Sequence, residues 1–145
     1  MVPAPEGVEL SFPEDGGCFG CSPSNTSGMQ LRFRREGTRV RAGYRIPDRF
    51  HGAPGIAHGG IVAAILDEIS CAAAVFVADR FVVTGELAIR YEQPVPVETT
   101  LELEAEIVGQ SHARYAEIEA CVRHGDALLA RSTGKFFYQE RRAQP

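Results

Sequence analysis

Hydrophobic and polar residues alternate along most of the chain. The clearest case is residues 101–107, where Leu101, Leu103, Ala105 and Ile107 alternate with three glutamates. This period-two pattern is typical of a strand with one buried face. Similar alternation predicts strands at about residues 29–34, 39–46, 81–91, 99–109, 113–123 and 127–139. The first two strands are expected to form an antiparallel hairpin across a turn at Glu36-Gly37, with their arginines facing solvent.

One long apolar tract, from Ile61 to Ala78, interrupts this alternation. Asp67, Glu68 and Ser70 lie at its centre, and one charged residue at the middle of a membrane helix costs about 2.5–3.5 kcal/mol. We therefore expect a helix at about residues 60–78, buried inside a soluble protein and not in a membrane. The order of two strands, one helix and four strands predicts an α+β fold, with a curved antiparallel sheet around one long central helix. Residues 1–28, rich in Pro, Gly and Ser, are expected to be an irregular arm, and residues 29–140 a single domain.

Composition narrows the class of protein. The chain has 145 residues, 44% hydrophobic and 23% charged, which are the values of one soluble globular domain. Its net charge of −4 does not favour a nucleic-acid partner. Four cysteines are too few for a disulfide scaffold, and Met1 to Glu6 show no signal-peptide pattern. We expect a cytoplasmic protein with reduced thiols.

The candidate chemistry lies between His51 and Glu68. Gly59-Gly60 stands at the predicted helix start, where unpaired N–H groups and the positive end of the helix dipole can stabilise an oxyanion. Asp67 lies further along the same helix in apolar sequence, where a carboxylate is costly unless it is paired or at an opening in the core. The alternatives are a plain loop-to-helix junction for the glycines and a backbone-satisfied or solvated carboxylate for Asp67.

Other polar residues leave two interpretations open. Glu68 is expected to be solvated or to form a salt bridge. His58 and His51 are candidates for a base or a ligand, or for bracing the loop through hydrogen bonds. The pair Cys18-x-x-Cys21 could begin a zinc knuckle or form a redox pair, but no second pair follows, and Cys71 and Cys121 fall within a predicted helix and strand. We therefore expect a structural turn and no metal.

These residues resemble a known family. The segment from Phe50 to Gly60, FHGAPGIAHGG, followed by Asp67, looks like the signature of hotdog-fold acyl-CoA thioesterases of the phenylacetate-pathway (PaaI-type) group. Three further stretches match over about residues 18–139: CFGC with Asn25 and Gly28-Met29, the strand VVTGEL at 82–87, and its exit RYEQPVP at 90–96.

The resemblance implies a hotdog fold that dimerises, with active sites at the dimer interface and a homotetramer, a dimer of dimers, as a further possible assembly. It implies that the Gly59 N–H polarises the thioester carbonyl and that Asp67 of the partner subunit acts as general base or nucleophile, assisted by Thr84. In many relatives an Asn or Gln six residues before the histidine shares the carbonyl. That position is Gly52 here, and the resemblance places His51, one residue earlier, in the role.

The candidate catalytic residues are therefore Asp67, Gly59, Thr84 and His58, and the candidate substrate-binding residues are His51, Gly60 and Glu68. The expected substrate is an acyl-CoA, with no cofactor apart from the coenzyme A of the substrate itself, and Arg80, Arg90 and Arg114 are candidates for contacting it. No Gly-x-Ser-x-Gly elbow is present, which argues against an α/β-hydrolase. The alternatives to a thioester hydrolase are a non-catalytic acyl-CoA binding or sensing module and a purely structural dimer.

Overall fold

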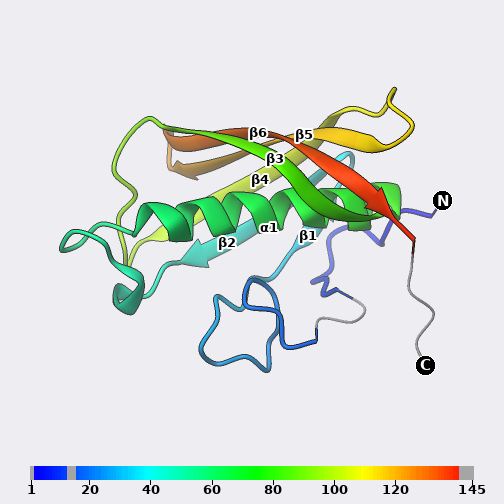
Figure 1. Cartoon of the computed structure of the whole chain (residues 1–145). Coiled ribbons are helices and arrows are strands. Elements are labelled where there is room, and N and C mark those ends of the chain that lie inside the picture. Colours follow the sequence, from blue (N-terminus) through cyan, green and yellow to red (C-terminus); the bar gives the residue numbers. More distant parts are fainter. Residues whose placement is uncertain (1, 13–15, 141–145) are drawn as a thin grey trace.

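A computed structural model describes residues 2–12 and 16–140 of the chain (Figure 1). Met1 and residues 13–15 of the expected arm lie outside this range. The elements, in chain order, are β1 (Arg34–Glu36), β2 (Arg39–Arg45), a short 3-10 helix η1 (Asp48–Phe50), α1 (Gly59–Ala78), β3 (Phe81–Tyr91), β4 (Thr100–Gly109), β5 (Tyr115–His124) and β6 (Ala127–Gln139). In the described part of the chain the strands form one sheet in the order β1-β2-β4-β5-β6-β3, and neighbours are antiparallel throughout.

The helix α1 lies along one face of this sheet and packs against all of its strands (Figure 1). By length and composition alone α1 could cross a membrane, but more than half of its most apolar window is buried inside the protein. The burial of α1 inside the protein explains its apolar character, because a helix in the core is apolar on several sides. One long helix packed against an antiparallel sheet is the arrangement that the alternation predicted and the hotdog architecture that the resemblance implies, and both expectations are confirmed.

The first predicted strand is wrong in part. Met29, Leu31 and Phe33 are buried, as the alternation required, but β1 begins only at Arg34. The backbone N–H groups of Met29 and Leu31 donate to the carbonyls of Phe19 and Gly20 in the arm, and not to β2. The arm thus provides the hydrogen bonds that a neighbouring strand would have provided. The hairpin between β1 and β2 is confirmed, with the solvent-facing arginines of β2 as expected.

A β-bulge interrupts β3 between Thr84 and Glu86, where the pairing with β6 shifts by one residue. Before the bulge Val82 packs against the core, and after it Leu87 and Ile89 do so. The side chains that face the helix therefore change from even to odd numbers at Gly85. A bulge adds one residue to one strand and reorients the side chains that follow. This bulge sets which residues of β3 point to α1.

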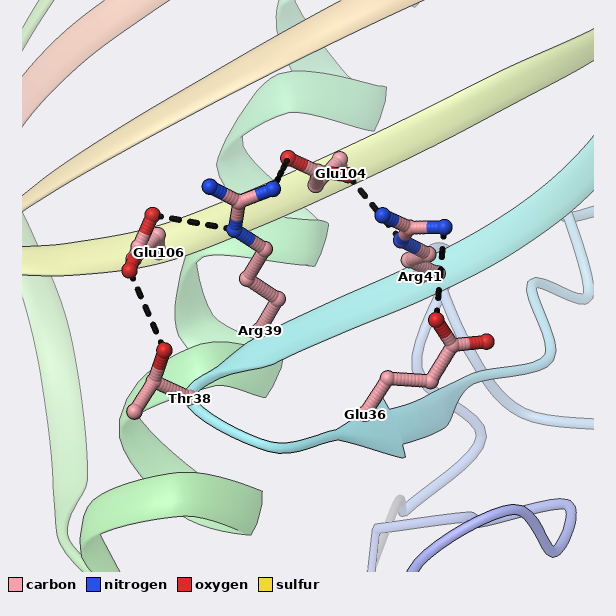
Figure 2. A network of polar contacts seen from close by, with 6 residues as sticks. All are labelled: Glu36, Thr38, Arg39, Arg41, Glu104 and Glu106. Carbon is pink, nitrogen blue, oxygen red and sulfur yellow. Dashed lines mark hydrogen bonds and ion pairs between the residues drawn. The ribbon is translucent and has the colours of Figure 1, made fainter.

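The outer face of the sheet carries paired charges (Figure 2). Arg39 on β2 contacts both Glu104 and Glu106 on β4, at 3.2 and 3.1 Å. Arg41 joins Glu104 to Glu36 at 3.0 and 3.3 Å. These pairs are partly exposed, so each contributes little to stability. Arg39 and Arg41 thus belong to a solvated strand face, as expected for the arginines of the hairpin.

Candidate functional site

The start of α1 leaves one backbone donor available. His58 is the N-cap residue, and its Nδ1 accepts a hydrogen bond of 2.9 Å from the N–H of Gly60. The N–H groups of Ile61 and Val62 both point to the carbonyl of His58. Within the described residues the N–H of Gly59 has no hydrogen-bond partner. The first turn thus presents an exposed Gly59 donor at the positive end of a twenty-residue helix.

A cavity of about 380 Å³ lies beside this donor. Its lining includes Ile56, Gly59, Val62, Tyr91 and Pro94 and is mainly apolar. The hydroxyl of Tyr91, at the end of β3, donates a hydrogen bond of 2.7 Å to the carbonyl oxygen of Gly59. Tyr91 therefore ties the sheet to the helix start and forms one wall of the cavity. An apolar hollow next to a free N–H donor suits a ligand with a carbonyl group on an apolar chain.

Asp67 lies on α1 beside β3. Thr84 donates a hydrogen bond from its Oγ1 to Oδ1 of Asp67, at 2.5 Å. Asp67 is half-buried and Thr84 is exposed, so the carboxylate is at the edge of the core and not sealed within it. The structure thus brings together the two residues that the resemblance had associated. This hydrogen bond fixes the orientation of the Asp67 side chain relative to β3.

Gly59 and Asp67 do not meet within one chain. They are eight residues apart on α1, which corresponds to about 12 Å along the helix axis. A carbonyl oxygen that accepts from Gly59 is therefore out of reach of the carboxylate of the same chain. Gly59 is the first residue of α1 and Asp67 is near its middle. The resemblance had placed Asp67 of the partner subunit, and not of the same chain, beside Gly59, and that arrangement stays a prediction.

The histidines lie in the loop that precedes α1. His51 Nδ1 is 2.6 Å from the carbonyl oxygen of Asp48, and the backbone of His51 forms a bridge with Ala57. His58 donates its backbone N–H to Phe50 O and braces Gly60 through its ring. Both histidines thus hold the loop through hydrogen bonds, which is the second of the two interpretations left open. Both remain exposed at the helix start, and their catalytic or binding role stays a prediction.

Glu68 corrects an expectation. Its side chain is neither fully solvated nor part of an ion pair in the described part of the chain, because the turn from Cys18 to Cys21 covers it. Cys18 Sγ lies 3.9 Å from Glu68 Oε1, and burial, followed by the neighbouring charge of Asp67, raises the pKa of Glu68, while the two thiols counteract that shift. Glu68 thus faces the arm and not the cavity at Gly59.

The arginines proposed for coenzyme A are spread over the fold. Arg80 stacks on the ring of Tyr138 at 3.7 Å, and Arg90 lies 3.5 Å from Glu92. Arg114 is exposed and makes no ion pair with the described residues. The structure of one chain does not group them, and they remain candidates.

Sequence reasoning missed Tyr91 as a member of the site. Its number on β3 has the opposite parity to Thr84, so a regular strand would place the two on opposite faces. The available signal was Gly85, since a glycine within a strand pattern is typical of a bulge.

Comparisons with known proteins agree with this fold. A thioesterase superfamily protein is similar to the chain with a TM-score of 0.78 at 22% identity, over 94% of this chain and 70% of the other. A thioesterase superfamily protein from Shewanella loihica PV-4 is 30% identical, over 76% of this chain and 91% of its own, with a TM-score of 0.63. A Streptococcus mutans UA159 protein, solved bound to acetyl CoA, is 20% identical over 78% and 91%, with a TM-score of 0.69.

Curated proteins give no sequence match to the chain. A family model does match, over residues 54–130, and its description is thioesterase superfamily. This range is more than half of the chain and contains the helix start, the cavity wall at Tyr91 and the Asp67–Thr84 pair described above. With the sequence match and the fold in agreement, the chain belongs to the thioesterase superfamily.

Proposed function

We propose that the protein hydrolyses an acyl-CoA thioester to a free acid and coenzyme A, at a site formed between two copies of the chain. The observation that carries the proposal is the unpaired, exposed N–H of Gly59 at the start of α1, beside an apolar cavity. A fixed N–H donor that stabilises the developing oxyanion accelerates acyl transfer by about 10²–10³. The acetyl CoA bound to the Streptococcus mutans relative supports a ligand of this class.

In the proposed dimer, Gly59 of one chain and Asp67 of the other chain lie at the same site. β3 is an edge strand of eleven residues with largely exposed side chains, and such an edge can pair with the same edge of another copy. An antiparallel pairing centred between Leu87 and Ala88 sets Thr84 opposite Tyr91 of the partner subunit. Because Thr84 holds Asp67 and Tyr91 holds Gly59, this pairing brings the carboxylate of one chain to the helix start of the other.

Two chemical routes fit this arrangement. In the first, Asp67 takes a proton from water while the water oxygen bonds to the carbonyl carbon, whose oxygen is held by the Gly59 N–H. In the second, an Asp67 oxygen attacks the carbon, and water then hydrolyses the resulting anhydride. In both, the carbon–sulfur bond breaks, the thiolate of coenzyme A leaves and is protonated, and the acid is released.

The chain offers a matched pair of variants for the Gly59 N–H. Gly59 is the first helical residue, where proline is well tolerated, and the extended His58 that precedes it, with ψ near 135°, accepts a following proline. Gly59→Pro therefore removes the N–H and is expected to keep the helix. Gly59→Ala keeps the N–H, and its added Cβ lies in ordinary contact with the hydroxyl of Tyr91 at 3.6 Å.

The test is hydrolysis of short, medium, long and aromatic acyl-CoA substrates by these variants and by Asp67→Asn. We expect Gly59→Pro to lower kcat by about 10²–10³ and Gly59→Ala by much less. Asp67→Asn is expected to lower kcat by about 10²–10⁴. A folded wild-type protein that is inactive on every substrate contradicts the proposal, as does an Asp67→Asn variant with full activity. Tight acyl-CoA binding in calorimetry without turnover favours the binding or sensing module instead.

A further inference from the structure

The turn between Cys18 and Cys21 covers α1 next to the proposed active carboxylate and is not used by the proposed reaction. Two thiols and one carboxylate meet there: Cys18, Cys21 and Glu68. One potential ligand atom from each lies within 4.8 Å of the other two. The three residues come from two segments about fifty positions apart in the chain, so the fold and not local sequence brings them together.

The distances are close to those of a bound zinc ion. With Zn–S bonds of about 2.3 Å and Zn–O bonds of about 2.0 Å, a tetrahedral ion separates a sulfur from an oxygen by about 3.5 Å. The observed distance from Cys18 Sγ to Glu68 Oε1 is 3.9 Å. This pair is therefore about 0.4 Å wider than a bound ion requires, and all three ligand atoms lie within 4.8 Å of one another.

The backbone of the turn also donates a hydrogen bond to one of the two sulfur atoms. The N–H of Gly20 donates a hydrogen bond to Cys18 Sγ at 3.3 Å, and hydrogen bonds to a ligand sulfur are part of the outer shell of many metal sites. A Cβ on Gly20 would lie 2.4 Å from Glu68 Oε2. A side chain at position 20 would therefore displace the carboxylate of Glu68 from the turn.

The cluster has no positive charge of its own. Within the described residues Glu68 has no ion pair with a lysine, arginine or histidine, and the groups it meets in the cluster are the two thiols. A covered carboxylate without a cation is costly, and two adjacent thiols are weak hydrogen-bond donors. Zinc binding would displace the thiol protons to solvent, and the ion would then neutralise the two thiolates and the carboxylate.

We propose that Cys18, Cys21 and Glu68 bind one zinc ion. Thiolates select soft or borderline metals, and a carboxylate beside two of them is a donor set that zinc accepts. Three protein ligands leave one position for water. The bound ion would fasten the N-terminal arm to α1 at the residue next to Asp67. This inference departs from the expectation, drawn from the sequence, of a turn without metal, and it does not depend on the proposed hydrolysis.

The first experiment measures zinc in the full-length protein. The protein is reduced, stripped with a chelator, dialysed against a small excess of zinc and analysed by plasma mass spectrometry. We expect about one zinc per chain for the wild type, loss of that zinc in Cys18→Ser and Cys21→Ser, and a dissociation constant raised at least about tenfold in Glu68→Gln. Cys121→Ser, on β5 and away from the turn, is the matched control and is expected to keep the ion.

A cobalt experiment covers the case in which a cysteine variant fails to fold. Cobalt(II) bound to the wild-type protein is expected to give a thiolate-to-cobalt charge-transfer band together with the visible bands of a four-coordinate ion. Glu68→Gln is expected to weaken cobalt binding and to keep the charge-transfer band at saturation. The proposal is overturned if the wild type binds no stoichiometric zinc, if its cobalt form lacks the charge-transfer band, or if Cys121→Ser loses the ion as readily as Cys18→Ser.

Discussion

Thr84 Oγ1 on β3 donates a hydrogen bond to Asp67 Oδ1 on α1, so that the edge strand of the sheet holds the proposed active carboxylate. Among the described residues, Thr84 is the side chain that forms a hydrogen bond with the Asp67 carboxylate. The bulge at Gly85 reorients the residues that follow it, so that Thr84 and Tyr91 both face the helix although one number is even and the other odd. The orientation of Asp67 is therefore controlled from the strand at which a second copy is proposed to pair.

Replacing Thr84 tests this control. Thr84→Val keeps the shape of the side chain and removes the hydroxyl, so the carboxylate loses a hydrogen bond worth about 1.5–3 kcal/mol. We expect kcat to fall by at least about tenfold, with KM nearly unchanged. Thr84→Ser restores the hydroxyl and is expected to recover most of kcat. Equal activity in all three proteins would show that the hydrogen bond does not position Asp67 for the reaction.

Tyr91 is expected to affect the oxyanion donor through the backbone. Tyr91→Phe removes the hydrogen bond to Gly59 O, whose net value is about 0.5–1.5 kcal/mol. We expect kcat/KM to fall by up to about tenfold, while the melting temperature changes little because Tyr91 is exposed. Tyr44→Phe, on β2, serves as the control, and a similar loss in that variant would contradict a specific role for Tyr91.

The bulge has its own stability test. A Cβ on Gly85 would lie 2.2 Å from the ring of Phe137 and 3.3 Å from the carbonyl oxygen of Lys135. We expect Gly85→Ala to lower the free energy of unfolding by roughly 1–3 kcal/mol, measured by urea denaturation. Gly43→Ala is the control, because nothing lies within 4 Å of its added Cβ. If the two variants unfold at the same urea concentration, the bulge does not require glycine at position 85.

Subunit mixing tests the shared site. Asp67→Asn chains keep the Gly59 donor, and Gly59→Pro chains keep the carboxylate. A mixed dimer therefore has one intact site and one site that lacks both groups. After unfolding and refolding at equal amounts, half of the dimers are mixed, and we expect about a quarter of the wild-type activity from two nearly inactive parents. A mixture no more active than its parents would contradict a site shared between two chains.

Glu98 gives a prediction for pH. It accepts hydrogen bonds from the backbone N–H of Asp48 and from Arg45, and these contacts lower the pKa of its carboxyl from 4.5. A carboxyl with a lowered native pKa stabilises the fold above its unfolded pKa, and this contribution is lost as the pH falls through the native value. We expect an NMR titration of the Glu98 side chain to give a midpoint below 4.5. The Glu98→Gln variant is expected to be less stable than the wild type at pH 7 and to match it at low pH.

Most of the fold could be predicted from the sequence because β2, β4, β5 and β6 each have one buried face. The alternation at residues 101–107 and the apolar run of α1 report burial directly, and both elements appear where they were expected. The segment from Met29 to Phe33 shows the limit of that signal. Its alternate residues are buried, but burial does not reveal the hydrogen-bond partner, which here is the arm.

The site could be predicted only in its local parts. A free N–H at a helix start follows from Gly59-Gly60 and the helix pattern. The partner of Glu68 lies about fifty residues away, and no period in the sequence links the two segments. The role of Tyr91 could not be predicted because the extra residue at Gly85 moves the side chains that follow on β3 to the opposite face of the strand.

Because of the bulge, the number of residues between Thr84 and Tyr91 can be compared with the corresponding number in related sequences. The interval is seven residues, an odd number, and it serves two contacts on the same face only because one residue is extruded between them. A relative without the bulge needs an even interval to keep both contacts. A gain or loss of a single residue in this strand should therefore occur together with the gain or loss of the glycine bulge, a pattern that sequences alone can reveal.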